Sequence, residues 1–297
     1  DDMELAARLL GPARAAGIPL LASAASGPRP ADSADILFRV GASARQHGAA
    51  IARVLGGADS VVVLRGGDAV SAEVAAGLAA ALAPAEDEDG DEGGPAGAGR
   101  MFAEVVAGED PGADAQAVAA ADPDAVVITV GGDGAEARLA ALQAAGIDPG
   151  RLWLTGAAYG RYSDAAGVLA GAHGIRSGVS ADEAFLAAVR QEDPGASLGD
   201  APAAYDAAVL AALAALLAGD DGGPSIAAFL RAAAADGVPC RSYGECAAVH
   251  ADGQDIRYVG ASGALAFRED GERVEVAIVT STYDDRNRPV PDAVTPL

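Results

Sequence analysis

Short apolar runs alternate with segments of helical spacing along the first half of the chain. The runs at 60–66 and 125–130 are continuously apolar, as expected for strands that are buried on both faces. Helical patterns follow them at 70–83 and 135–146. This alternation predicts an α/β fold with a parallel sheet and right-handed crossovers. The other expected strands are 18–23, 36–40, 100–108, 151–156 and a strand near 173–180, and the other expected helices are 44–55 and 115–122.

The pattern changes after residue 160. Three helical segments are expected at 182–191, 201–219 and 224–237. The last third of the chain ends in β-like segments, 255–270 and 273–284. Between them, REDGER carries Asp-Gly at its tip, which predicts a hairpin.

The composition of the chain argues against some classes of partner. The 297 residues allow two lobes with separate cores, and a net charge of −23 argues against nucleic acid and against anionic membranes as partners. Every basic residue is arginine. No apolar run reaches the ~20 residues of a membrane span, and 203–218 is expected to be a buried helix. The acidic, glycine-rich segment 84–99 is expected to be a solvated loop, since its carboxylates lack the spacing of a calcium loop.

The two cysteines, Cys240 and Cys246, are close in sequence. They form either a short-loop disulfide or two free thiols, and we favour the disulfide, which would stabilise the fold by about 2 kcal/mol. Their spacing fits no common zinc pattern, and no metal site is expected. A disulfide implies an exported protein.

The stretch VVITVGGDGAEARLAALQ at 126–143 is similar to phosphate-binding turns of nucleotide kinases. Ala135 and Glu136 follow the turn, no lysine exists to hold phosphate, and the carboxylates would repel an anion. A kinase is therefore not favoured. Asp133 is either a helix N-cap or a ligand contact.

No catalytic set emerges from the sequence. His47, His173 and His250 are scattered, and GASGA at 260–264 lacks the spacing of a nucleophile elbow. We expect no enzyme activity and no cofactor.

Several stretches together resemble the type I periplasmic binding-protein family, in particular the branch that binds branched-chain amino acids for ABC importers. GPARAAGIPLLASAAS (11–26) is similar to the segment that carries the family's ligand turn. ILFRV with the helix after it, VVITVGGDGAEARLAALQAAGI and AYDAAVLAALA match later elements in order. The tail 240–272 is similar to one common in actinobacterial members, which includes the cysteine pair.

The resemblance implies two lobes of doubly wound parallel sheet. Residues 1–40 plus 163–297 would form the first lobe and 41–162 the second, with hinge crossings near 39–43 and 159–163. Members begin with a strand-helix-strand-helix stretch that is missing here, so the first lobe is expected to be incomplete. Such a protein closes two rigid lobes over a ligand without making or breaking a bond.

The resemblance also implies ligand contacts. In the first lobe the family's ligand turn matches Ala24, Ala25 and Ser26, next to Ser23. In the second lobe Asp68 follows a strand as a ligand contact or a helix N-cap, and Asp133 occupies the equivalent turn. Tyr159 offers a ring or has a structural role, and Tyr205 is expected in the core.

The sequence as a whole predicts an extracytoplasmic solute-binding protein, a monomer that passes a small polar ligand, such as an amino acid or a related compound, to an ABC permease. Its location would be the cell surface, with a lipidated cysteine upstream of Asp1 as anchor. A ligand-sensing domain of a receptor or regulator with the same fold is one alternative. A degenerate, non-binding interaction module is another.

Overall fold

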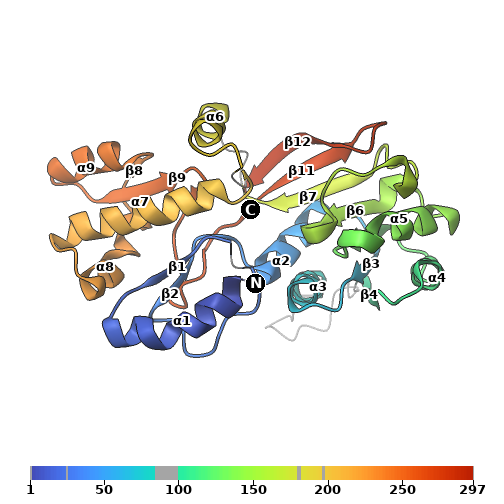
Figure 1. The fold of residues 1–297 in the computed structure, drawn as a ribbon, viewed down its shortest axis with the longest axis horizontal. Helices are drawn as coiled ribbons and strands as arrows, with labels where there is room; N and C mark the ends of the chain where they lie inside the picture. The colour runs from blue at the N-terminus through green and yellow to red at the C-terminus, as the bar shows by residue number, and fades with distance from the viewer. Residues whose placement is uncertain (1, 25, 84–99, 179–181, 196–197, 297) are drawn as a thin grey trace, which may run out of the picture. The chain divides into compact units, whose positions relative to one another are not determined.

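The computed structural model describes residues 2–24, 26–83, 100–178, 182–195 and 198–296, and the chain divides into two compact units (Figure 1). Unit 1 comprises 1–43, 177–277 and 296–297, and unit 2 comprises 44–176 and 278–295. The predicted segment 84–99 lies outside the described residues.

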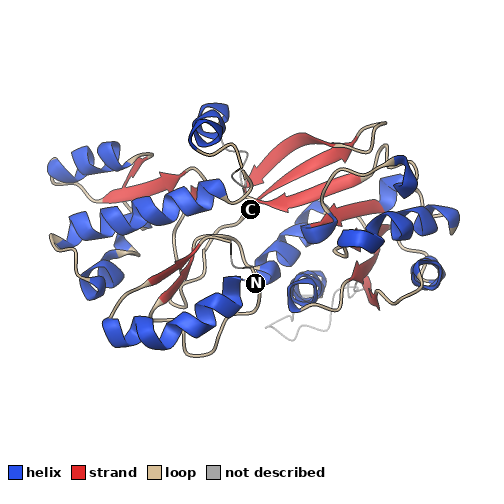
Figure 2. Cartoon of the chain, viewed as in Figure 1, coloured by secondary structure: helices blue, strands red, loops and turns tan. Residues whose placement is uncertain are grey.

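Unit 2 is built on a seven-stranded sheet with the order β12-β11-β7-β6-β5-β3-β4 (Figure 2). The strands β4, β3, β5, β6 and β7 pair in parallel. The parallel sheet was predicted, but β7 was expected in the other lobe. β11 is antiparallel to β7. The amide of Gly178 donates to the carbonyl of Ala277, and the amide of Tyr283 donates to the carbonyl of Ala172. The strand bounds are β3 Ser60–Arg65, β4 Met101–Val106, β5 Ala125–Ile128, β6 Leu152–Thr155, β7 His173–Ser177, β11 Ala277–Tyr283 and β12 Pro289–Pro296.

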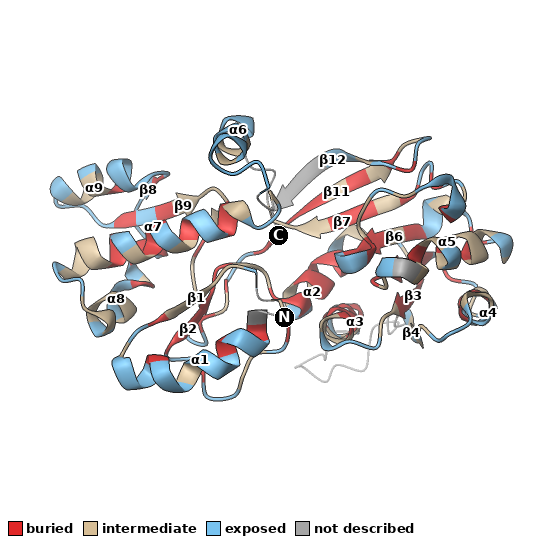
Figure 3. Cartoon of the chain, viewed as in Figure 1, coloured by how far each residue is buried: buried red, intermediate tan, exposed pale blue. Residues whose placement is uncertain are grey.

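Helices cover both faces of the middle of this sheet. Val62 and Val126 point into a core shared with α4 (Pro111–Ala120) and α5 (Ala135–Ala144). Val61, Val63 and Val127 point to the opposite face and have no exposed surface. In Figure 3, β3 and β6 are accordingly coloured mostly as buried. Burial on both faces explains why these strands are continuously apolar. The helices α2 (Ala44–Val54) and α3 (Ala69–Leu82) precede and follow β3.

Two glycines allow α2 and α3 to pack closely. A Cβ added to Gly48 would lie 2.0 Å from the carbonyl oxygen of Val74, and one added to Gly77 would lie 1.9 Å from that of Arg45. Nonbonded carbon and oxygen atoms do not approach each other this closely. The backbones of α2 and α3 are therefore in contact at positions where only glycine fits.

Unit 1 contains a two-stranded parallel sheet, β1 (Leu20–Ala22) with β2 (Leu37–Arg39). One face packs against α1 (Asp2–Ala16) through Leu37. The other face packs against α7 (Ala201–Ala218), where Phe38 lies in a core with Leu210 and Leu213. The sheet is therefore the middle of three layers.

The rest of unit 1 surrounds α7. Its elements are β8 Val238–Cys240, β9 Ile256–Gly260 and β10 Gly263–Ala264 in one sheet, with the helices α6 Glu183–Glu192, α8 Gly223–Phe229 and α9 Tyr243–Ala251. By length and composition α7 would be able to cross a membrane. The helix lies at the core of unit 1, however, and buried core helices have the same length and apolar composition.

Most predicted elements are present. The prediction of one helix over 224–237 is wrong. The observed helix α8 ends at Phe229, and a 3-10 turn follows at Ala232–Ala234. The predicted hairpin is confirmed by a bridge between Phe267 and Arg273, with Gly271 in a left-handed conformation (φ +79°) at its turn. The sequence did not predict α1, β8, α9 or β12.

The unit boundaries differ from the expected lobes. Residues 163–176 and 278–295, expected in the first lobe, lie in unit 2. The physical reason is strand pairing: β7 pairs with β6, and β11 pairs with β7, so both strands extend the sheet of unit 2. The hinge crossings stay a prediction.

We expect Gly48→Ala and Gly77→Ala each to lower the free energy of unfolding of unit 2 by about 1–3 kcal/mol, because the added methyl forces α2 and α3 apart. Urea denaturation measures this. Gly57→Ala is the control, since nothing lies within 4 Å of an added Cβ there. Equal stability of all three variants would show that the helices do not touch at the two glycines.

Candidate functional site

The carboxyl ends of β3, β5 and β6 meet at one edge of the sheet in unit 2, and glycine-rich turns follow each strand. Gly67, Gly132 and Gly156 are exposed and have no neighbour within 4 Å of an added Cβ. A Cβ on Gly131, by contrast, would lie 2.0 Å from the carbonyl oxygen of Ala157. The turns after β5 and β6 therefore approach closely. This edge of an open parallel sheet is the usual place for a ligand.

Asp68 lies in the turn after β3 and caps α3. Its carboxylate accepts a hydrogen bond from the amide of Ser71 at 2.9 Å. Burial acts to raise the pKa of Asp68, but the hydrogen bonds from Ser71 and from the backbone of Asp68 and Val70 together outweigh it, so the pKa is lowered. The side chain is exposed and ionised at neutral pH. The N-cap interpretation is thus confirmed, and ligand contact by Asp68 stays a prediction.

Asp133 lies in the 3-10 turn Gly132–Gly134 after β5. The N-cap of α5 is Gly134, so the interpretation of Asp133 as the cap of that helix is wrong. The cap position falls one residue later because the turn continues directly into the helix. Ligand contact by Asp133 stays a prediction.

Tyr159 follows β6 and is half-buried. Its hydroxyl lies 3.1 Å from that of Ser281 on β11, and its ring packs over Gly174 of β7. Tyr159 thus holds the turn after β6 against the sheet of unit 2. This contact fits the structural role, and its use as a ligand contact remains a prediction.

A buried polar cluster lies beneath these turns. His47 of α2 hydrogen-bonds through Nε2 to the hydroxyl of Thr155 at the end of β6. Burial lowers the pKa of His47 to about 4, so its ring is neutral. Thr129, just after β5, is 2% exposed, and its hydroxyl has no hydrogen-bond partner among the described residues. The sequence pointed to none of this, because a lone histidine and two threonines carry no motif.

In unit 1 the predicted ligand turn follows β1. Ser23 and Ser26 are half-buried and Ala24 is exposed, whereas Ala25 lies outside the described residues. The turn is held close to the end of β2, since a Cβ on Gly41 would lie 2.3 Å from the carbonyl oxygen of Ser23. Contact of these residues with a ligand stays a prediction.

Buried charges support this turn from beneath. Arg39 of β2 is 1% exposed; it donates to the carbonyl of Gly27 at 2.9 Å and pairs with Glu272 at 3.1 Å. Arg29 pairs with the same carboxylate at 3.2 Å. Two arginines on one carboxylate offset the cost of burying charge. They tie the loop after β1 to the hairpin at 268–273.

A second network lies directly after β2, at its carboxyl end. Asp206 of α7 has no exposed surface and accepts hydrogen bonds from the hydroxyl of Tyr258, from the amides of Ala261 and Ser262 and from the Ser262 hydroxyl. Arg273 donates to the carbonyls of Val40 and Ser262 at 3.1 Å. Burial lowers the pKa of Arg273 to about 10, against the attraction of Asp206.

The prediction that Tyr205 packs in the core is therefore wrong. Tyr205 is 44% exposed and meets Phe185 edge to face, while the next residue, Asp206, turns inward. The carboxylate is stable there because it receives four hydrogen bonds.

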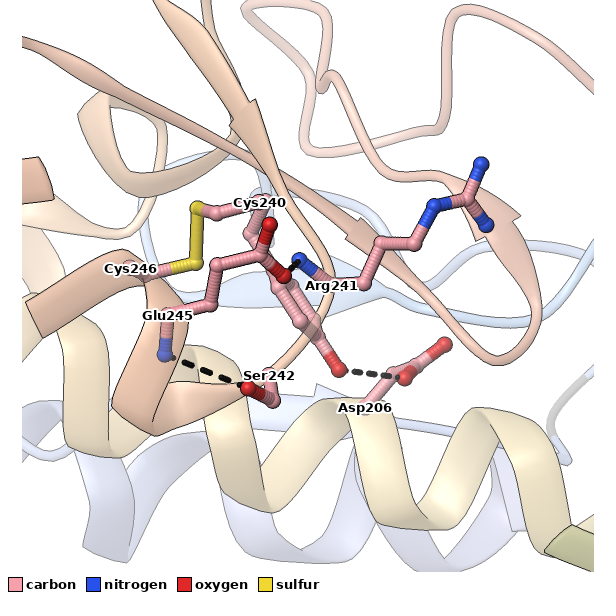
Figure 4. Close-up of a disulfide and its surroundings, with 7 residues drawn as sticks. Asp206, Cys240, Arg241, Ser242, Glu245 and Cys246 are labelled. Atoms are coloured by element: carbon pink, nitrogen blue, oxygen red, sulfur yellow. Dashed lines mark hydrogen bonds between the residues drawn. A yellow bond between two sulfur atoms is a disulfide. The ribbon is translucent and has the colours of Figure 1, made fainter. Parts of the chain in front are cut away.

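The disulfide between Cys240 and Cys246 is confirmed, with a Cα–Cα distance of 5.1 Å (Figure 4). It joins the end of β8 to α9. Ser242 caps α9 by accepting from the amide of Glu245, and the Glu245 carboxylate accepts from the amide of Arg241. This Ser-x-x-Glu pattern is a capping signal from which α9 was predictable.

In the described part of the chain no three His, Cys, Asp or Glu side chains gather as a metal site.

This chain is similar to known proteins in its structure. No protein-family model matches the sequence, and no curated protein matches it. Among solved structures, the substrate-binding protein LivJ of the branched-chain amino acid transporter from Streptococcus pneumoniae, in complex with isoleucine, is 19% identical with a TM-score of 0.65. The match covers 98% of this chain and 76% of LivJ.

Two further structures agree. A solute-binding protein of an ABC transporter from R. palustris, in complex with benzoate, is 17% identical with a TM-score of 0.65, over 99% of this chain and 76% of its own. The leucine-binding protein LivK from Thermotoga maritima is 17% identical with a TM-score of 0.60, over 96% and 75%. The chain has the type I periplasmic binding-protein fold.

For the fold, the resemblance inferred from the sequence is confirmed. The turns after β1, β3, β5 and β6 of this fold carry the residues that the sequence analysis predicted as ligand contacts. Their assignment to a ligand is a separate step.

We expect acid to destabilise unit 2 through His47. Above pH 6.5 the ring is neutral whether folded or unfolded, but below it the unfolded chain binds a proton that the folded ring refuses until about pH 4. Stability is therefore lost as pH falls from 6.5 to 4, by about 2 kcal/mol between pH 7.5 and pH 5.

Urea denaturation at both pH values tests this contribution. In His47→Asn the loss over that interval should be smaller by the same amount, whatever the stability of the variant at pH 7.5. Parallel pH dependence of the two proteins would rule the contribution out.

We also expect the disulfide to stabilise unit 1 of this fold. Replacing both cysteines by alanine should lower the free energy of unfolding of unit 1 by about 2 kcal/mol, because the open chain gains conformational entropy. Dithiothreitol should destabilise the wild type and leave the double variant unchanged. A wild type insensitive to the reductant would contradict the prediction.

Proposed function

We propose that this protein is an extracytoplasmic solute-binding protein that captures a small polar ligand for an ABC importer. The observation that carries the proposal is the match of nearly the whole chain, 98%, to a substrate-binding protein structure at a TM-score of 0.65. Two of the named structures, LivJ and the R. palustris protein, are binding proteins in complex with isoleucine and benzoate. An ABC permease is then the partner.

The disulfide supports a location outside the cytoplasm. The bridge between Cys240 and Cys246 is buried in unit 1, and such structural disulfides persist in oxidising compartments. The net charge of −23 suits a soluble surface that repels other acidic molecules.

The chemistry of the strand ends supports a small polar ligand. The exposed glycine turns after β3, β5 and β6 let a ligand approach backbone N–H groups, which bind a carboxylate. Asp68, ionised at neutral pH, suits a cationic group on the ligand. We propose Asp68, Asp133 and Tyr159 in unit 2, and Ser23 to Ser26 in unit 1, as ligand contacts. An amino acid or a related compound carries both kinds of charge.

Calorimetric titration with amino acids, amides, polyamines, benzoate and short-chain acids tests the proposal. We expect saturable binding of at least one compound with no chemical change of that compound. If none of these classes binds at millimolar concentration, the solute-binding function is refuted.

For a compound that binds, Asp68→Ala should weaken the affinity by about tenfold, as expected when one charged contact is lost. The variant also removes a helix cap, so Asp148→Ala is the control. Asp148 caps a 3-10 turn through Gly150 but precedes β6, at the other end of the strand. Equal affinities of the wild type and Asp68→Ala would remove Asp68 from the site.

A further inference from the structure

The segment that follows β6 in unit 2 has little regular structure of its own. The chain makes a 3-10 turn at Gly156–Ala158 and another at Asp164–Ala166. The amide of Tyr159 donates to the carbonyl of Gly156 and closes the first of them. Turns this short do not hold one conformation by themselves, so the shape of residues 156–160, the turn after β6, depends on contacts from elsewhere in the unit.

The hydroxyl of Tyr283 holds the end of this turn. Tyr283 is the last residue of β11 and is 2% exposed. Its hydroxyl donates to the carbonyl of Gly160 at 2.9 Å and accepts from the amide of the same residue at 3.3 Å. Both polar backbone groups of Gly160 are thus bonded to one phenol oxygen. Because glycine restricts its own backbone least, this contact supplies a restriction that the residue itself lacks.

A second phenol holds the middle of the turn. The hydroxyl of Tyr162 donates to the carbonyl of Ala158 at 2.5 Å. Its ring packs against the core of unit 2, with its centroid 6.4 Å from that of the Tyr283 ring. Burial, together with the charge of Glu136, raises the pKa of Tyr162 to about 12, and burial also raises the pKa of Tyr283. Both hydroxyls therefore stay protonated at neutral pH and can donate.

The hairpin formed by β11 and β12 extends the same support (Figure 1). Asn287 lies in its turn and is 4% exposed. The side-chain amide of Asn287 donates to the carbonyl of Ser163 at 3.1 Å and to that of Gly167 at 2.8 Å. The backbone carbonyl of Asn287 accepts from the amide of Tyr162. The hairpin thus holds the chain from 158 to 167 at several points.

These hydrogen bonds fix how the turn after β6 presents its exposed backbone. The carbonyls of Gly156, Ala158 and Gly160 are all bonded within unit 2. Ala158 is buried, whereas Gly156 and Ala157 are exposed at the edge of the sheet where the ligand contacts are proposed. The conformation in which the backbone of 156–157 meets a ligand is therefore set by partners that lie behind it.

We propose that Tyr283 is a positioning residue for solute binding. Through Gly160 it holds the turn after β6 in the conformation that a ligand meets, and Tyr162 assists through Ala158. A turn that is ordered before binding does not have to be ordered by the ligand, so the affinity is higher. With 2% of its surface exposed, Tyr283 acts through the turn and not by contact with the ligand. This inference rests on the solute-binding function proposed above.

Tyr283→Phe is the test, because it removes the hydroxyl and keeps the ring in the core. The probes for calorimetry are isoleucine and benzoate, and any other compound that binds in the titration above. We expect Tyr283→Phe to weaken binding about tenfold, and Tyr162→Phe to weaken it by a smaller factor. Tyr205→Phe is the control, since it removes the same atom from a ring that packs against Phe185 in unit 1. It should change the affinity less than about twofold.

Hydrogen exchange separates positioning from a general loss of stability. The amide of Tyr159 bonds to Gly156 and not to Tyr283, so it reports on the order of the turn. In the free Tyr283→Phe variant this amide should exchange about tenfold faster than in the wild type, and the increase should exceed any increase at the amides of β5. Saturation with a probe that binds should return it to the wild-type rate, because the ligand then orders the turn.

Wild-type affinity in Tyr283→Phe, or an unchanged exchange rate at Tyr159, overturns the inference and leaves the solute-binding function in place. An equal loss of affinity in Tyr205→Phe also overturns it, since the effect would then not act through the turn. If the wild type binds no compound of the titration, both proposals are refuted. The wild-type titration therefore tells the two failures apart.

Discussion

The parallel pairing of β4, β3, β5, β6 and β7 is the constraint on which unit 2 depends. Each connection must return the chain to the same end of the sheet, so every strand finishes at one edge. The turns with Asp68, Asp133 and Tyr159 follow three of these strands and gather there for that reason alone. The turns need not be similar in sequence, and the glycines at each of them leave the backbone accessible.

The close packing of the helices follows from the same constraint. A parallel strand buried on both faces needs a helix layer on each, and α2 and α3 approach until their backbones touch at Gly48 and Gly77. His47 lies in α2 next to one of these glycines. Its ring is buried against Thr155 at the strand ends, where burial favours the neutral form.

Unit 1 uses buried charge where unit 2 uses apolar packing. Arg39 and Arg29 share Glu272, and Asp206 gathers four hydrogen bonds beside Arg273. These contacts hold β2 and the turn after β1. Since the small sheet buries little surface, polar contacts with fixed geometry position its loops.

The sequence by itself determined the alternation of strands and helices, the parallel sheet and the hairpin at 268–273, and it favoured the disulfide. Apolar runs, helical spacing and two nearby cysteines are local signals, and these need no knowledge of distant residues. Segments without such a signal were missed, as with α1, which has Gly11 and Pro12 within it. Only the tertiary structure decided that Asp206 is buried and Tyr205 exposed, that His47 meets Thr155, and that β11 belongs to the sheet of unit 2. Each of these depends on residues far apart in the chain, and the energy that buries a polar group comes from partners that the local sequence does not name.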